Sequence, residues 1–248
     1  MPALRALLAL LSLQLLTFAQ QYIPAWFENL PSAPAGYTLA VGYSGKFNSN
    51  LRARNYALNT AFTIMAKQLN IRLLFELEEL NDGRLRLLNP TFKQFYEETV
   101  LNNVKADYGV IDSSITAEGY FILIAYPRLE RLNLPDNRDK NWGPRPSWVS
   151  GQLPEEKGFV YGLGQVARYR SWVRAWHDAD EHARFDIGKN LNIKAESTTT
   201  SQRDNRKTIE STVIKQSYDL LLKNVTVVAR WFDPATATYY ALARAPRQ

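Results

Sequence analysis

Cysteine is absent from this chain of 248 residues. The protein therefore forms no disulfide bond, and its fold depends on a hydrophobic core. Hydrophobic residues make up 46% of the chain and aromatic residues 12%, which is sufficient for such a core. The absence also excludes a cysteine nucleophile and a lipid anchor on a cysteine at a signal-peptide junction.

Long hydrophobic runs are absent beyond the N-terminus. There, Arg5 precedes an apolar run over residues 6–16 and the small-residue pattern Thr17-Phe18-Ala19. This pattern is typical of a signal peptide, and we expect residues 1–19 to be removed before Gln20. The run is shorter than the about 20 apolar residues of a membrane span, so an uncleaved anchor is the less favoured alternative. We therefore expect an exported protein, periplasmic or associated with the outer membrane.

Runs of basic residues are absent as well. The formal net charge is +6, or +5 once Arg5 is removed, and the positive residues are scattered. A mild excess of positive charge without a basic helix is better suited to binding anionic envelope surfaces or glycans than to binding nucleic acid.

What the chain does contain is an internal repeat. Residues 24–72 match residues 146–194 without a gap, at 13 of 49 positions. Further matches, with small shifts, are "LNNV" (101–104) with "LKNV" (222–225), Asp112 with Asp233, and "GYFILIAYPR" (119–128) with "TYYALARAPR" (238–247). We infer two tandem modules, residues 20–128 and 146–248, joined by a linker over 129–145 that is rich in Pro, Asn and charge.

Each copy has the pattern β-α-β-α-β-β. Alanines at a four-residue spacing predict helices over 50–69 and 171–191 that pack closely on a sheet. A second helix is expected near 91–102 and near 206–222. The predicted strands are 37–43, 72–80, 104–112 and 119–126 in the first copy, and 159–164, 194–202, 225–233 and 238–244 in the second, with a hairpin at "PATA" (234–237). The fold class is α+β, mainly antiparallel sheet with helices covering one face.

Both histidines lie in "AWHDADEHAR" (175–184) on the second of these helices. His177 and His182 point about 140° apart on a regular helix, so they cannot bind one ion together. The pairs His177 with Glu181 and Asp178 with His182 offer two ligands each, fewer than zinc requires. The equivalent positions in the first copy are Asn55, Tyr56, Asn59 and Thr60, which have no metal-binding character. We interpret the cluster as a solvated helix face; a metal-dependent enzyme site is the alternative.

The expected buried stripe of this helix is Trp172, Ala175, Trp176, Ala179, Ala183 and Ile187.

Other signatures of catalysis are lacking in the sequence. It has no Gly-x-Ser-x-Gly, and no serine has a histidine partner. Gly158, Gly162 and Gly164 lack the Lys-Ser/Thr of a phosphate-binding loop, so we expect the glycines to allow close approach of a helix to a strand. The acidic pairs Glu78-Glu79 and Glu97-Glu98 are not repeated in the second copy. We expect no cofactor, no metal and no enzymatic activity.

Arg230, Trp231 and Asp233 form the most prominent candidate binding group, at the end of a predicted strand. An exposed arginine beside aromatic residues can bind a partner protein or a sugar. The alternative, which we favour, is that this strand end packs against its own hairpin. Trp26 and Trp148 occupy equivalent positions, and we expect them to anchor the start of each module. The candidates for a sugar-stacking groove are Trp142, Trp148 and Trp231.

Three shared features are a Gly-[Tyr/Phe]-x-x-[Ala/Gly]-[Val/Leu]-Gly strand, an alanine-spaced helix ending in Leu-Asn-Ile, and "LLKNVTVVARWFDPATATYYALAR" (221–244). In these features the chain resembles the lipoprotein-20 (LPP-20) family of Gram-negative envelope proteins, closely in the second copy and more loosely in the first. The resemblance implies a surface or outer-membrane protein, lipid-anchored and without known catalysis. The chain departs from the family in having no cysteine at the signal junction, which implies an unanchored form. The positions that match the pattern are Ala175, Ala179, Ala183, Val228, Ala229, Arg230, Trp231, Asp233, Tyr239, Tyr240 and Ala241.

These features together predict a non-enzymatic envelope protein that serves as a structural, assembly or binding component. Its partners would meet exposed sheet edges or aromatic strand ends. We expect envelope proteins or cell-wall glycan as partners, with self-association into a homo-oligomer as one option. We expect no nucleic acid and at most a peripheral contact with the membrane. The alternative function is a periplasmic glycan-binding or peptidoglycan-binding protein.

Overall fold

The computed structural model describes residues 23–79, 85–86, 92–134, 142–167, 171–191, 196–200 and 213–247. The predicted signal peptide, residues 1–19, lies outside these residues. No helix in the described part of the chain is both long and apolar enough to cross a membrane.

The first copy contains α2 (Ala25–Glu28), β1 (Thr38–Ser44), α3 (Asn50–Leu69), β2 (Asn70–Glu79), β3 (Leu85–Arg86), β4 (Lys93–Phe95), α4 (Glu98–Ala106), β5 (Gly109–Ile115) and β6 (Tyr120–Tyr126). The second copy contains the 3-10 helix η1 (Ser147–Ser150), β7 (Phe159–Ala167), α5 (Trp172–Asn190), β8 (Glu196–Thr200), β9 (Val213–Lys223), β10 (Thr226–Asp233) and β11 (Thr238–Pro246).

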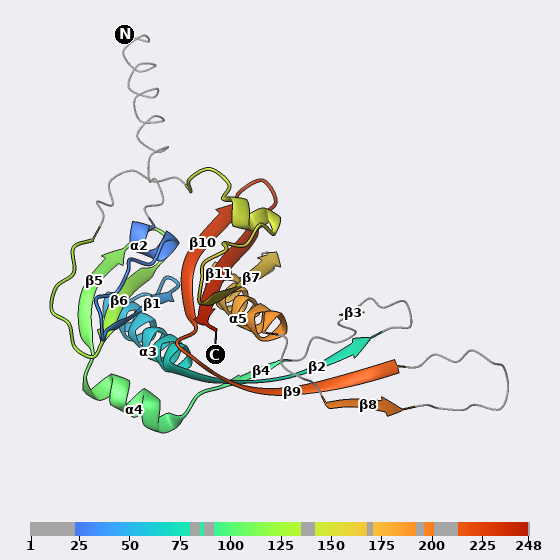
Figure 1. The fold of residues 1–248 in the computed structure, drawn as a ribbon. Coiled ribbons are helices and arrows are strands. Elements are labelled where there is room, and N and C mark those ends of the chain that lie inside the picture. The colour runs from blue at the N-terminus through green and yellow to red at the C-terminus, as the bar shows by residue number, and fades with distance from the viewer. Residues whose placement is uncertain are drawn as a thin grey trace, which may run out of the picture.

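Each copy forms a three-stranded antiparallel sheet of the same topology, β1-β6-β5 in the first and β7-β11-β10 in the second (Figure 1). The registers of strand pairing also agree. Thr38 pairs with Tyr126 in the first copy, and the equivalent residues of the second copy, Val160 and Ala245, pair with each other. Each outer strand carries a β-bulge at the equivalent step of its pairing. The predicted α+β fold with antiparallel sheets is therefore confirmed.

The long helices α3 and α5 each cover one face of the sheet of their own copy (Figure 1). A Cβ atom on Gly42 would lie 2.0 Å from the carbonyl oxygen of Ala57, and one on Gly164 would lie 1.9 Å from that of Ala179. These two contacts occupy equivalent positions of the repeat. The prediction that glycines allow the alanine-faced helix to approach its strand is confirmed for Gly162 and Gly164, and it is wrong for Gly158, where an added Cβ would meet no atom within 4 Å.

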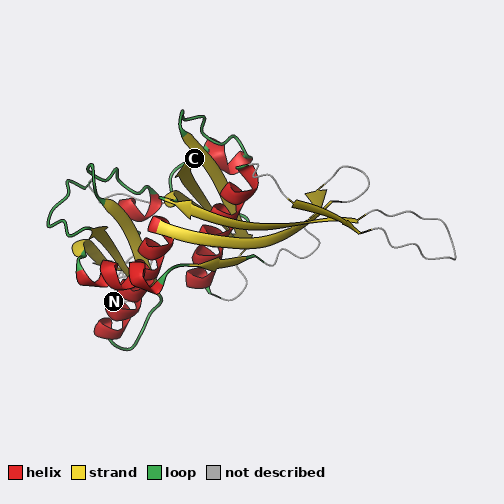
Figure 2. Ribbon diagram, turned by 60° about the horizontal axis from the view of Figure 1, so that its bottom comes forward, coloured by secondary structure: helices red, strands yellow, loops and turns green. Residues whose placement is uncertain are grey.

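The third sheet is an arm to which both copies contribute. Strand β2 of the first copy pairs antiparallel with β9 of the second, from Asn70 opposite Lys223 to Glu79 opposite Ile214. Strands β3 and β4 pair with β2, and β8 pairs with β9. The arm extends away from the two three-stranded sheets in both views (Figures 1 and 2).

The second helix was predicted with shifted bounds in the first copy and wrongly in the second. Helix α4 begins at Glu98 and ends at Ala106, whereas the expected range was 91–102. In the second copy, the described part of the segment expected to be helical near 206–222 is strand β9. This segment is extended because of a tertiary contact: β9 pairs along its length with β2. Its side chains alternate as in a strand, with Leu220 buried and Leu221 exposed.

The structure also corrects the alignment of the repeat after the first long helix. Residues 101–104 lie in helix α4, whereas residues 222–225 end β9 and enter the following turn, so the two stretches are not equivalent. Asp112 lies opposite Leu123 just after the bulge, and the residue in that position of the second copy is Ala229 rather than Asp233.

One continuous hydrophobic core joins the two copies. The ring of Phe27 packs edge-on against Trp176 at 5.3 Å between centroids, and Trp172 stacks on Phe121 at 5.6 Å. Trp176 in turn contacts Tyr239 within its own copy at 4.8 Å. These aromatic contacts stabilise the association of the copies beyond the area they bury.

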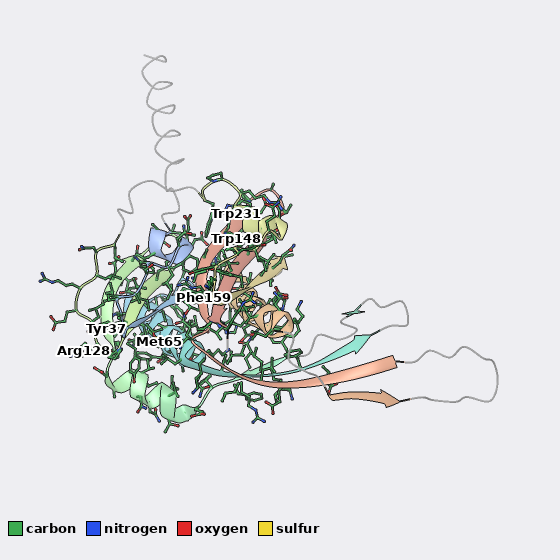
Figure 3. All side chains as sticks on the ribbon, viewed as in Figure 1. Tyr37, Met65, Arg128, Trp148, Phe159 and Trp231 are labelled. Carbon is green, nitrogen blue, oxygen red and sulfur yellow. The ribbon has the colours of Figure 1, made fainter. Side chains whose placement is uncertain are left out.

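Trp26 and Trp148 are both buried at the start of their copies, as predicted. The indole nitrogen of Trp26 donates to Asp112 at 2.8 Å. Trp148 packs in a smaller cluster with Trp231, and the two lie together at one end of the second copy (Figure 3). The indole of Trp231 donates to the carbonyl oxygen of Gly143 at 3.0 Å, which ties the segment between the copies to the sheet.

Candidate functional site

A cleft between helices α3 and α5 is the candidate functional site, and we call it the interhelical cleft. It holds a cavity of about 310 Å³. The α3 residues that line it follow the three- and four-residue spacing of one helix face, distinct from the alanine stripe that faces the sheet. The lining residues are Tyr56, Asn59, Thr60, Thr63, Ile64, Lys67, His177, Asp180 and Arg184.

A buried ion pair lies beside the cleft. Nε and Nη2 of Arg230 donate to the two carboxylate oxygens of Asp180 at 3.0 and 2.8 Å, and both side chains are 2% exposed. The remaining Nη1 of Arg230 donates to the carbonyl oxygen of Phe27 at 3.2 Å. Burial alone lowers the pKa of Arg230, but the charge and hydrogen bonds of Asp180 raise it above its ordinary value. The contacts of Arg230 join β10, α5 and the first copy.

Tyr43 approaches the same carboxylate from strand β1. Its hydroxyl lies 3.5 Å from Oδ2 of Asp180, at the limit of a hydrogen bond. Burial of the phenol and the negative charge of Asp180 hold the pKa of Tyr43 well above its ordinary value. The side chain is therefore a neutral donor at any physiological pH.

Arg184 is the buried cation of the cleft that lacks a partner. It is 1% exposed, and its Nε and Nη2 have no hydrogen-bond partner among the described residues. Burial lowers the pKa of Arg184, and the charges of Asp180 and Glu181 oppose that effect. Because a guanidinium keeps its proton in proteins, a positive charge with free donors is held between the helices.

Lys67 connects the two long helices across the cleft. Its Nζ lies 2.7 Å from Oε1 of Glu181, and the side chains are 8% and 24% exposed. Burial lowers the pKa of Lys67, and the charge of Glu181 opposes that effect. The pair uses the carboxylate of Glu181 for Lys67, and Nε and Nη2 of Arg184 keep no hydrogen-bond partner among the described residues.

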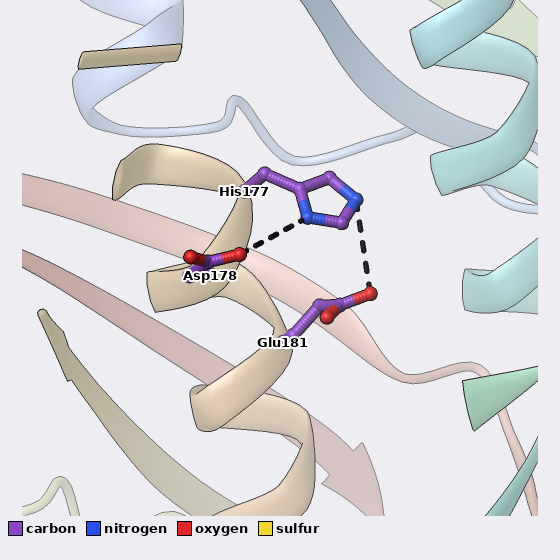
Figure 4. Close-up of side chains that lie close together, drawn as sticks. All are labelled: His177, Asp178 and Glu181. Atoms are coloured by element: carbon purple, nitrogen blue, oxygen red, sulfur yellow. Dashed lines mark ion pairs between the residues drawn. The ribbon is translucent and has the colours of Figure 1, made fainter. Parts of the chain in front are cut away.

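Three potential metal ligands meet beside the cleft (Figure 4). His177 lies 3.6 Å from Asp178 and 3.7 Å from Glu181, and one ligand atom from each residue falls within 4.8 Å of the others. The sequence alone indicated only pairs of ligands here, because Asp178 and His177 are neighbours in the chain, and neighbouring residues of a helix do not face each other. Asp178 also pairs with Arg174 at 3.2 Å, and Glu181 pairs with Lys67. Both carboxylates therefore already balance a cation.

His182 points away from this group, as predicted. Its Nδ1 lies 3.3 Å from the carbonyl oxygen of Gln165, and its ring packs against Phe92 at 5.5 Å between centroids. The interpretation of a solvated helix face holds for His182, which is exposed. It is wrong for Asp180, which is buried and paired.

The first copy has no charged counterpart to Asp180 and Arg184. At the separation of 122 residues, Asp180 corresponds to Leu58 and Arg184 to Phe62. The fold of one module is thus built with apolar residues at both positions. The charges are a property of the second copy rather than of the module.

The structure separates the three residues proposed as a binding group. Arg230 and Trp231 point to opposite sides of β10 and are 4% and 8% exposed, so their expected exposure is wrong. Asp233 is half-buried and its carboxylate accepts from the backbone N–H of Ala235, within the hairpin. The favoured alternative, a strand end packed against its hairpin, describes Trp231, which contacts Tyr240, and Asp233, but not Arg230, which pairs with Asp180 of α5. Trp148 is likewise buried, at 9% exposed, so it presents no open face for a sugar ring.

Sequence reasoning missed Asp180, Arg184, Lys67 and Tyr43 as members of one site. A signal was present for the first two, because Trp172, Trp176, Asp180 and Arg184 follow one another at intervals of four residues. This spacing places the two charges on the same ridge as the buried tryptophans. The contributions of Lys67 and Tyr43 depend on the packing of one copy on the other and have no local signal.

Comparisons with known proteins found no relative. No family model matches the chain. No curated protein and no solved structure matches it either.

Proposed function

We propose that this protein is a non-enzymatic structural or assembly component of the cell envelope, and that the β2–β9 arm is its interaction surface. The observation that carries the proposal is the arm itself, which both copies build and which extends beyond the body (Figures 1 and 2). The signal-peptide pattern and the resemblance to the lipoprotein-20 family support the envelope location.

The two faces of the arm differ near its base. Leu73, Phe75 and Leu220 are buried on one face, where their side chains surround Gly188 of α5. Leu221 is 52% exposed on the other face, and Phe95 of β4 is 46% exposed. An exposed sheet face with large apolar side chains is a surface suited to a protein partner.

The exposed apolar residues form a row with a charge between them. Arg72 of β2 lies opposite Phe95 on one side and opposite Leu221 on the other, so the three share one face. Arg72 also makes a two-point ion pair with Asp219, at 2.7 and 2.5 Å. A mixture of apolar and paired charged groups favours a specific partner over indiscriminate aggregation.

The interaction is tested by the size of the native complex in envelope extracts of the host. We expect wild-type protein in an assembly larger than the monomer, and Leu221→Lys protein to shift to the monomer position in size-exclusion chromatography. Leu51→Lys is the matched control, because Leu51 is 64% exposed on α3, away from the arm. A wild-type monomer, or equal behaviour of the two variants, would contradict the proposal.

The location is tested separately by fractionating the host envelope and reading the mature N-terminus by mass spectrometry. A chain that begins at Gln20 in the periplasmic fraction agrees with the proposal. A chain that begins at Met1 and sediments with the membrane shows that the N-terminal segment is an anchor.

A further inference from the structure

We propose that the interhelical cleft binds one small organic monocarboxylate, with the carboxylate paired to Arg184. This inference is independent of the proposed assembly function. It rests on the charge balance of the cleft, the shape of its lining and the absence of equivalent charges in the first copy.

The charge balance leaves one cation over. Asp180 compensates Arg230 through two hydrogen bonds, and Glu181 compensates Lys67 at 2.7 Å. Arg184 remains, with Nε and Nη2 unpaired among the described residues. Leaving a buried charge without a partner is costly, and an anion in the cleft beside the guanidinium lowers that cost.

The fold does not require this cation. The module folds with Phe62 at the corresponding position of the first copy. A phenylalanine fills such a position without any need for hydrogen bonds. A buried arginine beside a cavity is therefore better explained by a ligand than by packing.

The cleft is graded from a charged interior to an open, less charged side. Lys67, Ile64 and Arg184 are buried, whereas Tyr56 and Asn59 are exposed. A ligand would therefore place its carboxylate inward and its remaining atoms along Ile64 towards Tyr56. The cavity of about 310 Å³ lies at the lower end of the range for small-molecule sites, which favours a small ligand.

A single negative charge fits better than a double one. The carboxylates of Asp180 and Glu181 lie close enough to act on the pKa of Arg184, so they also repel an entering anion. One excess cation balances a monocarboxylate, whereas a phosphate dianion would leave an unbalanced negative charge. The flat guanidinium also suits the two oxygens of a carboxylate.

The test is isothermal titration calorimetry on the full chain with straight-chain monocarboxylates from acetate to octanoate, at constant ionic strength. We expect saturable binding of one ligand per chain, with affinity rising along the series until the cavity is filled. Arg184→Met should weaken binding about tenfold or more, because it removes a charge-assisted hydrogen-bonded pair. The matched control is Arg174→Met on the same helix, whose side chain is 68% exposed outside the cleft and whose loss should leave binding unchanged.

A second variant keeps the test decisive if Arg184→Met fails to fold. Thr63→Tyr places a large side chain in the cavity from α3 and leaves Arg184 unchanged in the sequence, and it should abolish binding in a protein with a native circular dichroism spectrum. Binding of the uncharged amides as tightly as the acids would overturn the proposal, because charge would then not be recognised. Binding of inorganic phosphate without any carboxylate, or no binding at all, would also overturn it.

Discussion

Asp180 is the acceptor on which the buried charges of the second copy depend. It receives two hydrogen bonds from Arg230, lies 3.5 Å from the hydroxyl of Tyr43, and precedes Arg184 by one helical turn. Both arginines are almost completely buried. Without Asp180, the protein would bury two guanidinium groups with only Glu181 nearby to oppose them.

Asp180→Ala is therefore expected to lower the free energy of unfolding by about 3–5 kcal/mol, as is typical when one partner of a buried ion pair is removed. Urea unfolding followed by tryptophan fluorescence measures the change. Asp178→Ala on the same helix is the control, and its partly exposed pairs predict a loss of at most about 1 kcal/mol. Equal losses of unfolding free energy in the two variants would show that the buried pair contributes no more to stability than a partly exposed pair.

The sequence predicts the framework of the site better than its chemistry. The alanine stripe of α5 follows from residue spacing alone, and Ala175, Ala179 and Ala183 are buried as expected. The pairing of Asp180 with Arg230 joins residues 50 positions apart on two elements. No periodicity of either element indicates that pairing, so it could not be predicted.

At the scale of elements, two crossings of a helix over a strand define the modules. Gly42 and Gly164 lie where the alanine-faced helix touches the first strand of each copy. The sequence indicated these contacts because both partners of each contact repeat at the same separation. It did not indicate strand β9, because pairing with β2 rather than any local pattern keeps that segment extended.

Gly164→Ala is expected to destabilise the protein by about 1–3 kcal/mol or more, because the new methyl group would overlap the backbone of α5. The nearest atom to the added Cβ is the carbonyl oxygen of Ala179, at 1.9 Å. Gly45→Ala is the control, since its Cβ would meet only a side-chain atom of Val173 at 3.6 Å. Thermal unfolding should separate the two variants clearly, and similar melting temperatures would contradict the close crossing.

The pairing of strands β2 and β9 near the body should weaken in acid. The hydrogen bond from Arg72 holds the pKa of Asp219 below its ordinary value. A carboxyl whose folded pKa is depressed stabilises the fold above its unfolded pKa of about 3.9, and this contribution is lost as the pH falls through the folded pKa. The protection factors of the amides of residues 70–76 against hydrogen exchange should therefore fall in this acid range, and less so in Asp219→Asn. An identical pH response of both proteins would contradict the role of the pair.

At the scale of the whole molecule, we expect the two copies to unfold as one cooperative unit. They share a hydrophobic core through Phe27 and Trp176, and they share the arm through β2 and β9. The hydrogen bond from Arg230 to the carbonyl oxygen of Phe27 and the ion pair of Lys67 with Glu181 add polar links between them. Modules that fold independently of each other would be expected to share few such contacts.

Trp176→Ala tests this coupling. The side chain is 1% exposed and contacts Phe27, Trp142 and Tyr239, so its loss should cost about 3–5 kcal/mol. Differential scanning calorimetry should show one transition, with equal calorimetric and van't Hoff enthalpies, in both wild type and variant. Two resolved transitions in the wild type would contradict a shared core.

The central claim, that the arm is the surface through which this molecule assembles, is tested most directly by photo-crosslinking in the living host. A photoreactive amino acid is placed at position 221 on the arm and, as the reference, at position 51 on α3. We predict a discrete crosslinked species from position 221 that is absent from position 51. No adduct from position 221, or the same adducts from both positions, would contradict the claim.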